Sequence, residues 1–95
     1  MAGEYLIDGM LSGTGVRDVL NGGYVEPSDL GLSTSLIARL SAWQKRYEET
    51  HFSDFPADQV AALDLEGIDL TRAVREERRD LKIGYYSHGL TKRLD

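Results

Sequence analysis

Residues 33–49 read STSLIARLSAWQKRYEE and place one apolar stripe along a helix. The apolar residues recur at spacings of four, three and four, which is the period of an amphipathic α-helix. Ser33 stands directly before the stripe, and a serine hydroxyl there can accept a backbone N–H of the first turn. We therefore predict a helix over residues 33–49 that buries its apolar face. That face consists of Leu36, Leu40, Trp43 and Tyr47.

A second helical stripe begins after a break at residues 51–56. It predicts a helix over residues 57–80, with acids early and arginines late, an order that favours the helix dipole. Gly67 lies on this stripe, although a glycine inside a helix costs about 1 kcal/mol relative to alanine. We expect Gly67 to mark either close packing against the first helix or a break in the second. The stripe consists of Val60, Leu63, Gly67, Leu70 and Val74.

Glycine dominates the first third of the chain, where seven of the ten glycines lie within residues 1–31. Asn21-Gly22-Gly23 predicts a tight turn because these residue types tolerate positive φ, and Pro27 ends the strand that returns from it. Short strands are predicted at residues 4–8, 16–20, 24–25 and 82–87. The predicted fold is one α+β domain over residues 1–95, in which two antiparallel helices pack on a small sheet. That sheet combines the N-terminal strands with one C-terminal strand.

Composition restricts the chemistry of the chain. Its 95 residues carry a net charge of −5 and include no cysteine, which excludes disulfides, thiolate zinc sites and cysteine nucleophiles. Because the chain is acidic, it would repel phosphate backbones and anionic lipids. We therefore expect no direct contact with nucleic acid or membrane. No apolar run is long enough for a signal peptide or a membrane span, and a cytoplasmic location is expected.

The chain contains no familiar catalytic or metal-binding motif. Gly13-Thr14-Gly15 lacks the third glycine of a dinucleotide-binding fingerprint, because Asp18 stands in its place. His51 and His88 are far apart in the chain, and the acids of residues 64–69 do not follow the spacing of a calcium loop. We predict no enzyme activity, no metal and no cofactor. A site assembled from scattered Asp, His and Tyr side chains stays open.

Negative charge is concentrated in two segments. Residues 1–31 hold five acids and one base, and residues 52–70 hold five acids and no base. If the two segments meet in space, they form one negative face that attracts a basic protein and speeds its association. Ordinary solubility charge explains the same pattern equally well.

Three stretches of the chain resemble small acidic bacterial proteins that occur beside polymorphic toxins. They are residues 23–33 (GYVEPSDLGLS), 36–43 (LIARLSAW) and 65–74 (LEGIDLTRAV). They are similar to immunity proteins of contact-dependent growth inhibition systems. The resemblance implies a cytoplasmic protein that binds and blocks the toxin domain of a neighbouring cell. Many such toxins are nucleases with basic substrate-binding surfaces, so the expected partner is a basic cognate toxin whose cleft the chain occludes.

Candidate toxin contacts come from both acidic segments and include one aromatic anchor, because aromatic residues dominate interface hot spots. The predicted partner-binding residues are Asp8, Asp18, Tyr24, Glu26, Asp29, Asp54, Asp58 and Glu66. We expect the side chains of Asp18, Glu26 and Asp29 to be exposed.

A different class of function stays open. The chain could be a non-catalytic regulatory or adaptor module, a homodimer among the options, with exposed Tyr85 and Tyr86 or the sheet edge as its contact surface. An antitoxin that represses its own operon is a third interpretation, which the negative net charge disfavours. Sizing the chain with and without a candidate partner separates the first two.

Overall fold

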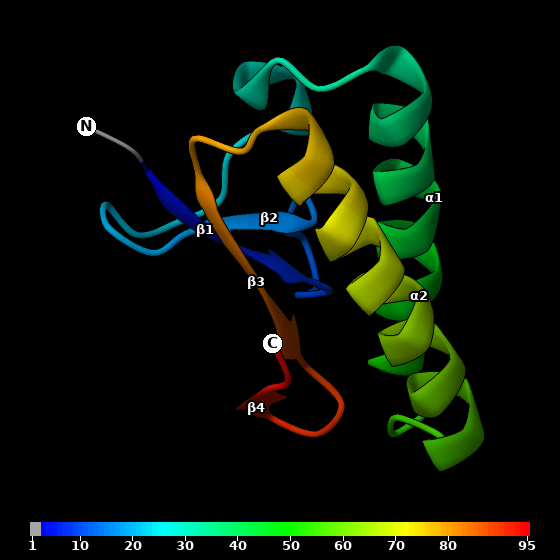
Figure 1. Ribbon diagram of the computed structural model, residues 1–95. Helices are drawn as coiled ribbons and strands as arrows, with labels where there is room; N and C mark the ends of the chain where they lie inside the picture. Colours follow the sequence, from blue (N-terminus) through cyan, green and yellow to red (C-terminus); the bar gives the residue numbers. More distant parts are fainter. Residues whose placement is uncertain (1–2) are drawn as a thin grey trace.

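Two α-helices cover one face of a four-stranded sheet in the computed structural model, which describes residues 3–95 (Figure 1). The strands are β1 (Glu4–Asp8), β2 (Val16–Asp18), β3 (Lys82–Ser87) and β4 (Lys92–Arg93). The helices are the short 3-10 helix η1 (Pro27–Leu30) and the α-helices α1 (Thr34–Thr50) and α2 (Ala57–Glu77). The predicted α+β class is confirmed.

The sheet is mixed, with the strand order β2-β1-β3-β4. β1 and β3 pair in parallel because both α-helices lie in the connection between them, whereas β2 and β4 run antiparallel to their neighbours. The two-residue strand β4 is an addition to the predicted fold. Two exposed basic residues carry no strand pattern in the sequence, and only their pairing with β3 defines them as a strand.

The second predicted strand ends early, at Asp18, because the Asp18 side chain starts a turn. Its carboxylate accepts hydrogen bonds from the backbone N–H groups of Leu20 and Asn21, which replace strand pairing. The predicted tight turn follows, and both of its glycines have positive φ. The predicted returning strand is reduced to a single bridge between Arg17 and Tyr24.

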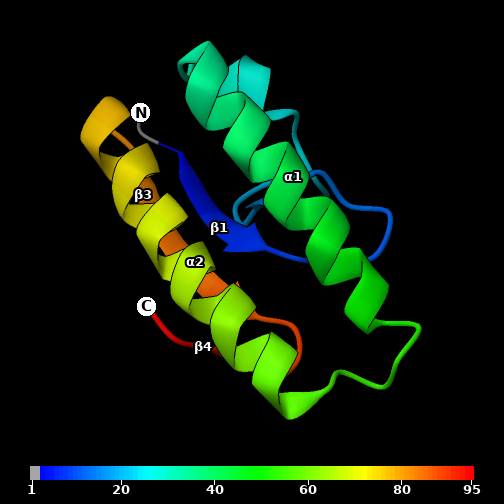
Figure 2. The ribbon, with the colours of Figure 1, turned by 90° about the vertical axis from the view of Figure 1, so that its right-hand side faces the viewer.

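Helix α1 buries its predicted stripe completely, since all four stripe residues are at most 2% exposed. Its cap is also confirmed, because the Ser33 hydroxyl accepts the Leu36 N–H at 3.3 Å. Helices α1 and α2 run antiparallel, side by side across β1 and β3 (Figure 2). Trp43 fills the space between them and donates its indole N–H to the Leu63 carbonyl oxygen at 2.9 Å.

Helix α2 differs from its prediction at two points. It ends at Glu77 rather than at residue 80, because Arg78 leaves helical geometry and its guanidinium pairs with Asp80, two residues further along. Gly67 does not break the helix, and its nearest neighbour is a tyrosine of β3 rather than a side chain of α1. A Cβ atom at Gly67 would lie 2.2 Å from Cε1 of Tyr85, so the glycine admits a tyrosine ring of β3.

No helix in the described part of the chain covers the face of the sheet opposite α1 and α2 (Figure 1). Side chains alternate along a strand, and the core takes Ile7, Val16 and Tyr85. Their strand neighbours therefore point to the other side, which we call the open face because no described helix covers it, although Leu6, Asp8 and Gly84 are buried there by loop and C-terminal residues. The open face consists of Leu6, Asp8, Arg17, Gly84 and Tyr86. Among the helices described in residues 3–95, none is long and apolar enough to cross a lipid bilayer.

Candidate functional site

Four exposed acids of the two acidic segments lie at opposite ends of the molecule, whereas exposed Asp69 lies within α2. Glu26 and Asp29 stand at η1, just before α1, and Asp54 and Asp58 stand just after it. A helix of 17 residues spans about 25 Å, and both ribbon views show η1 and the α1–α2 connection far apart (Figures 1 and 2). These four carboxylates therefore form two separate acidic ends rather than one continuous face.

Asp18 is buried, and the expectation that its side chain is exposed is wrong. Only 8% of the residue is accessible. Its carboxylate accepts the backbone N–H and the side-chain amide of Asn21 at 3.0 and 3.1 Å, and the N–H of Leu20 at 3.1 Å. These hydrogen bonds, led by that of the Asn21 backbone, lower the pKa of the Asp18 carboxyl. Asp18 thus closes the turn after β2.

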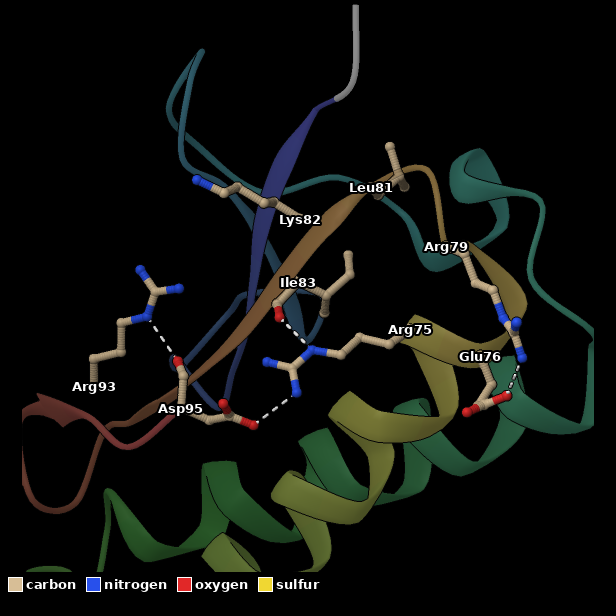
Figure 3. A pocket seen from close by; sticks show the side chains of 8 residues that line it. All are labelled: Arg75, Glu76, Arg79, Leu81, Lys82, Ile83, Arg93 and Asp95. Atoms are coloured by element: carbon tan, nitrogen blue, oxygen red, sulfur yellow. Dashed lines mark hydrogen bonds and ion pairs between the residues drawn. The ribbon is translucent and has the colours of Figure 1, made fainter.

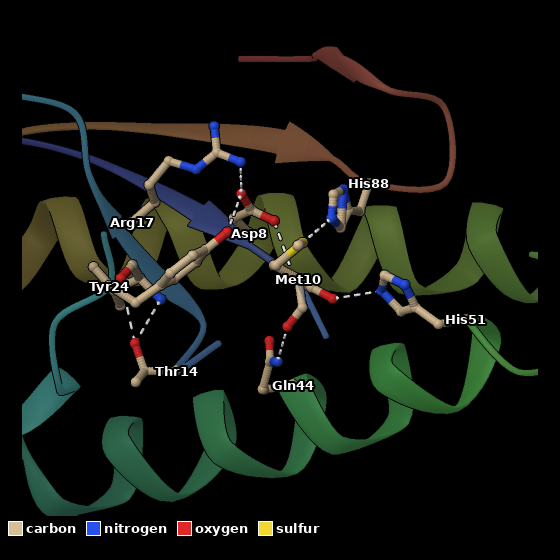
Figure 4. A network of polar contacts seen from close by, with 10 residues as sticks. Asp8, Met10, Thr14, Arg17, Tyr24, Gln44, His51 and His88 are labelled. Atoms are coloured by element: carbon tan, nitrogen blue, oxygen red, sulfur yellow. Dashed lines mark hydrogen bonds and ion pairs between the residues drawn. The ribbon is translucent and has the colours of Figure 1, made fainter. Parts of the chain in front are cut away.

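Asp8 and Tyr24 belong to a polar cluster on the open face (Figure 4). Asp8 is fully buried, and its Oδ2 accepts Arg17 at 2.7 Å and the Tyr24 hydroxyl at 3.1 Å. The Arg17 guanidinium also lies 5.2 Å from the ring centre of Tyr86. The Asp8 charge is therefore matched by Arg17 inside the protein. The half-buried Tyr24 ring is fixed by its own hydroxyl, and burial raises the pKa of that phenol.

The structure brings together two histidines that are distant in the sequence. The rings of His51 and His88 lie 5.1 Å apart, and His51 Nε2 donates to the Gly9 carbonyl oxygen at 3.1 Å. Burial lowers the pKa of His88, and the nearby His51 and Arg17 act in the same direction, whereas the Asp8 carboxylate opposes them. Within residues 3–95 no three His, Asp or Glu side chains are grouped as metal ligands. Only the fold, and no local pattern, joins this pair.

Glu66 is half-exposed and pairs with Arg46 of α1, so it links the two helices. The expectation of exposed tyrosines on β3 is wrong for Tyr85, which is fully buried because Gly67 makes room for its ring. Tyr86 is half-buried on the open face. Toxin contact by the eight predicted residues stays a prediction.

The arginines at the end of α2 line a hollow of about 560 Å³ beside β3 and β4 (Figure 3). Arg75 donates to the Ile83 carbonyl oxygen at 2.8 Å and to the Asp95 carboxylate at 3.0 Å. Arg93 donates to the backbone carbonyl oxygen of Asp95 at 2.7 Å. These cations fasten the last residue of the chain, which accounts for their clustering without a phosphate ligand.

A different surface has the composition of a protein interface. The α1–α2 connection and the turn between β3 and β4 lie side by side at one end of the molecule (Figures 1 and 2). There Phe52 is 79% exposed and Leu90 is 52% exposed, next to the exposed acids Asp54 and Asp58. We call these four residues the loop-end surface. Apolar anchors inside a charged rim are typical of binding sites.

The backbone is strained at Asp54 of the loop-end surface and at Phe55 and Thr91, which follow Asp54 and Leu90 in the chain. Asp54, Phe55 and Thr91 have φ values of 57°, 51° and 54°, which are unusual for residues other than glycine. Such strain gathers at functional sites. Sequence reasoning selected Asp54 and Asp58 here but missed Phe52 and Leu90. Two phenylalanines in a predicted interhelical break were the available signal.

The α+β fold carries exposed apolar side chains and exposed acids at the loop-end surface. Residues 14–88 match the family described as Serratia CdiI immunity protein-like, and the chain belongs to this family. The predicted resemblance to immunity proteins of contact-dependent growth inhibition is thereby confirmed. The comparisons with curated proteins and with solved structures give no match. An immunity protein inhibits a toxin by binding it, which indicates an inhibitor rather than an enzyme.

Proposed function

We propose that the chain neutralises its cognate toxin by occluding the substrate-binding surface of a basic nuclease domain. Family membership supports the immunity role. The net charge of −5 supports a basic partner, because opposite charge accelerates encounter and suppresses wrong partners. Carboxylates of the chain would take the place of RNA or DNA phosphates.

The loop-end surface is the proposed centre of the interface. Nanomolar binding needs about −12 kcal/mol, and rim charges alone cannot supply it. The observation that carries this choice is the exposure of Phe52 and Leu90 beside two exposed carboxylates, Asp54 on the strained connection and Asp58 in the first turn of α2. Glu26, Asp29 and Tyr24 form a second, more distant group of proposed contacts.

Co-expression with the toxin domain encoded by the neighbouring gene tests the role. We expect restored growth, a complex on size-exclusion chromatography, and loss of RNA or DNA cleavage by the purified toxin. If no complex forms and the chain does not relieve the toxicity, the proposal is wrong. A stable homodimer that ignores the toxin would favour the adaptor module instead.

The choice of surface is tested separately by Leu90→Ala. Removing a hot-spot side chain typically costs about 2 kcal/mol, or roughly 30-fold in Kd. Leu65→Ala is the matched control, because Leu65 is also an exposed leucine, 70% accessible, but lies on α2 outside the loop-end surface. Equal affinities for the two variants would place the interface elsewhere.

A further inference from the structure

The core contains a buried carboxylate that is not one of the four residues of the loop-end surface. Asp64 of α2 is 5% exposed. Its Oδ1 accepts the hydroxyls of Tyr47 at 2.8 Å and Tyr85 at 2.6 Å, and its Oδ2 accepts the Ser87 hydroxyl at 2.7 Å. Helix α1 and strand β3 thus both direct hydroxyl donors at one side chain of α2.

These donors are held in place by the turn that follows β3. The Tyr47 hydroxyl accepts the Gly89 N–H at 3.0 Å, and the Ser87 hydroxyl accepts the Leu90 N–H at 3.1 Å. Each hydroxyl accepts one backbone N–H and, because an ionised carboxylate can only accept, donates its proton to Asp64. Burial, and then the hydrogen bond to Asp64, raise the pKa of the Tyr85 phenol, so it also stays a donor.

Asp64 nevertheless lacks a cation. Within residues 3–95 no Lys, Arg or His forms an ion pair with it, although buried charges are normally paired. A carboxylate oxygen offers about two acceptor positions. Oδ1 uses both and Oδ2 uses one, so one acceptor position of Oδ2 remains.

Asp64 also lines a hollow that opens at the loop-end surface. The hollow has a volume of about 170 Å³. Its walls are otherwise almost wholly apolar, and Gly89 packs closely against Val60 to form one of them. Its lining includes Phe55, Val60, Ala61, Asp64, Gly89 and Leu90.

We propose that this hollow receives a lysine side chain of the bound toxin, with the ammonium group on Asp64 and the methylene stem along Val60, Ala61 and Leu90. The inference rests on the proposed function and names the partner chemistry of the same surface. A volume of 170 Å³ equals about five to six waters at ~30 Å³ each, which suits the five non-hydrogen atoms of a lysine side chain.

Lysine fits this site better than arginine does. A guanidinium pairs best through two parallel hydrogen bonds to both carboxylate oxygens, and Oδ1 already has two donors. The lysine ammonium group is a point charge that needs only one acceptor position on one oxygen. The methylene groups that carry it pack favourably against apolar walls.

The first experiment measures toxin affinity after the hollow is filled. Ala61→Phe should block it from an exposed position and weaken toxin binding by about 30-fold. Ala62→Phe is the matched control, because Ala62 is an exposed alanine that faces a different hollow of α2. Asp64→Asn, with folding verified by thermal unfolding, should weaken binding similarly while keeping the shape of the site.

Unchanged affinity in Ala61→Phe would overturn the lysine site and leave the immunity role standing. Failure of the wild-type chain to bind any toxin would overturn the immunity role instead, and a second probe then decides the site.

That probe is Nα-acetyl-lysine methylamide, titrated into the labelled chain and followed by NMR. We expect saturable shifts of the amides of Ala61, Gly89 and Leu90, smaller shifts with the arginine analogue, and none with the uncharged norleucine analogue. Ala61→Phe should abolish the shifts, and Ala62→Phe should preserve them. Equal shifts with norleucine, or no saturable shifts with lysine, would reject the site.

Discussion

At the scale of single residues, the closest fit in the core is between Gly67 and Tyr85. A Cβ atom at Gly67 would lie 2.2 Å from Cε1 and 2.7 Å from the hydroxyl oxygen of Tyr85. The missing side chain lets the tyrosine ring slide beneath α2 until its hydroxyl reaches Asp64 at 2.6 Å. A residue that weakens the helix locally therefore positions a buried hydrogen bond between helix and sheet.

Gly67→Ala tests this fit through the sign of its effect. Helix propensity alone would make alanine about 1 kcal/mol more stable. Overpacking against the ring should outweigh that gain and lower the free energy of unfolding by a net ~1–2 kcal/mol. Urea unfolding measures the difference, with Ala62→Gly as the control for propensity alone. A more stable Gly67→Ala variant would show that the ring can move aside.

Asp18 gives the chain a stability that depends on pH. Its pKa in the folded state lies below the ordinary value of 3.8. The stabilisation is therefore present above that value and is lost as the pH falls through the folded pKa. We expect the wild type to exceed Asp18→Asn in stability at neutral pH, and the gap to narrow in acid. Glu26→Gln, which alters an exposed carboxylate, controls for loss of a charge; a gap that is constant with pH would contradict the prediction.

At the scale of elements, the ends of the two α-helices are tied to each other. The Ser33 hydroxyl caps α1 and donates to the Glu77 carboxylate at 2.6 Å, and the Ser33 N–H donates to the same carboxylate at 2.6 Å. These two hydrogen bonds lower the pKa of Glu77. The first residue before α1 thus fixes the last residue of α2.

Ser33→Ala should lower the free energy of unfolding by about 1 kcal/mol, because it removes the cap of α1. Ser41→Ala, at an exposed position within α1, is the control and should be neutral or slightly stabilising. In a double-mutant cycle with Glu77→Gln, the two losses should not add, because both variants break one shared contact. Additive losses would show that the link contributes nothing.

Elements defined by neighbouring residues were predictable, and contacts between distant residues were not. The stripe of α1, its Ser33 cap and the strand β3 follow from local spacing, and the structure confirms them. The pairing of Asp8 with Arg17 depends on two strands meeting in one register. Burial of Tyr85 depends on a glycine of another element. Exposure of Asp18 was mispredicted because its side chain bonds its own backbone turn.

At the scale of the whole molecule, charge is distributed by position along α1. Glu26 and Asp29 stand before this helix, and Asp54 and Asp58 stand after it, about 25 Å away. Glu49, in the last turn of α1, adds a third exposed carboxylate to that second end. The Debye length at physiological salt is about 8 Å, so the two acidic ends act on a partner independently. Only the end that docks should influence the association rate strongly.

Removing two loop charges at each end therefore reports which end meets the toxin. Asp54→Asn with Asp58→Asn should slow association by about 3- to 10-fold at low salt, since these residues rim the proposed interface. Asparagine also tolerates the positive φ of residue 54. Glu26→Gln with Asp29→Asn should slow it less, because this end lies farther from the docking surface.

Stopped-flow mixing with the toxin domain, at salt concentrations from about 0.1 to 1 M, measures these rates, and the Debye length falls from about 10 to 3 Å over that range. At high salt the wild type should associate little faster than the variants that lack these carboxylates. The dissociation rate should change little with salt if apolar contacts hold the complex. Arg72→Gln with Arg79→Gln removes two exposed positive charges and should not slow association.

A larger effect from the pair at residues 26 and 29 would move the interface to η1. Rates indifferent to salt in every variant would assign these carboxylates to solubility alone.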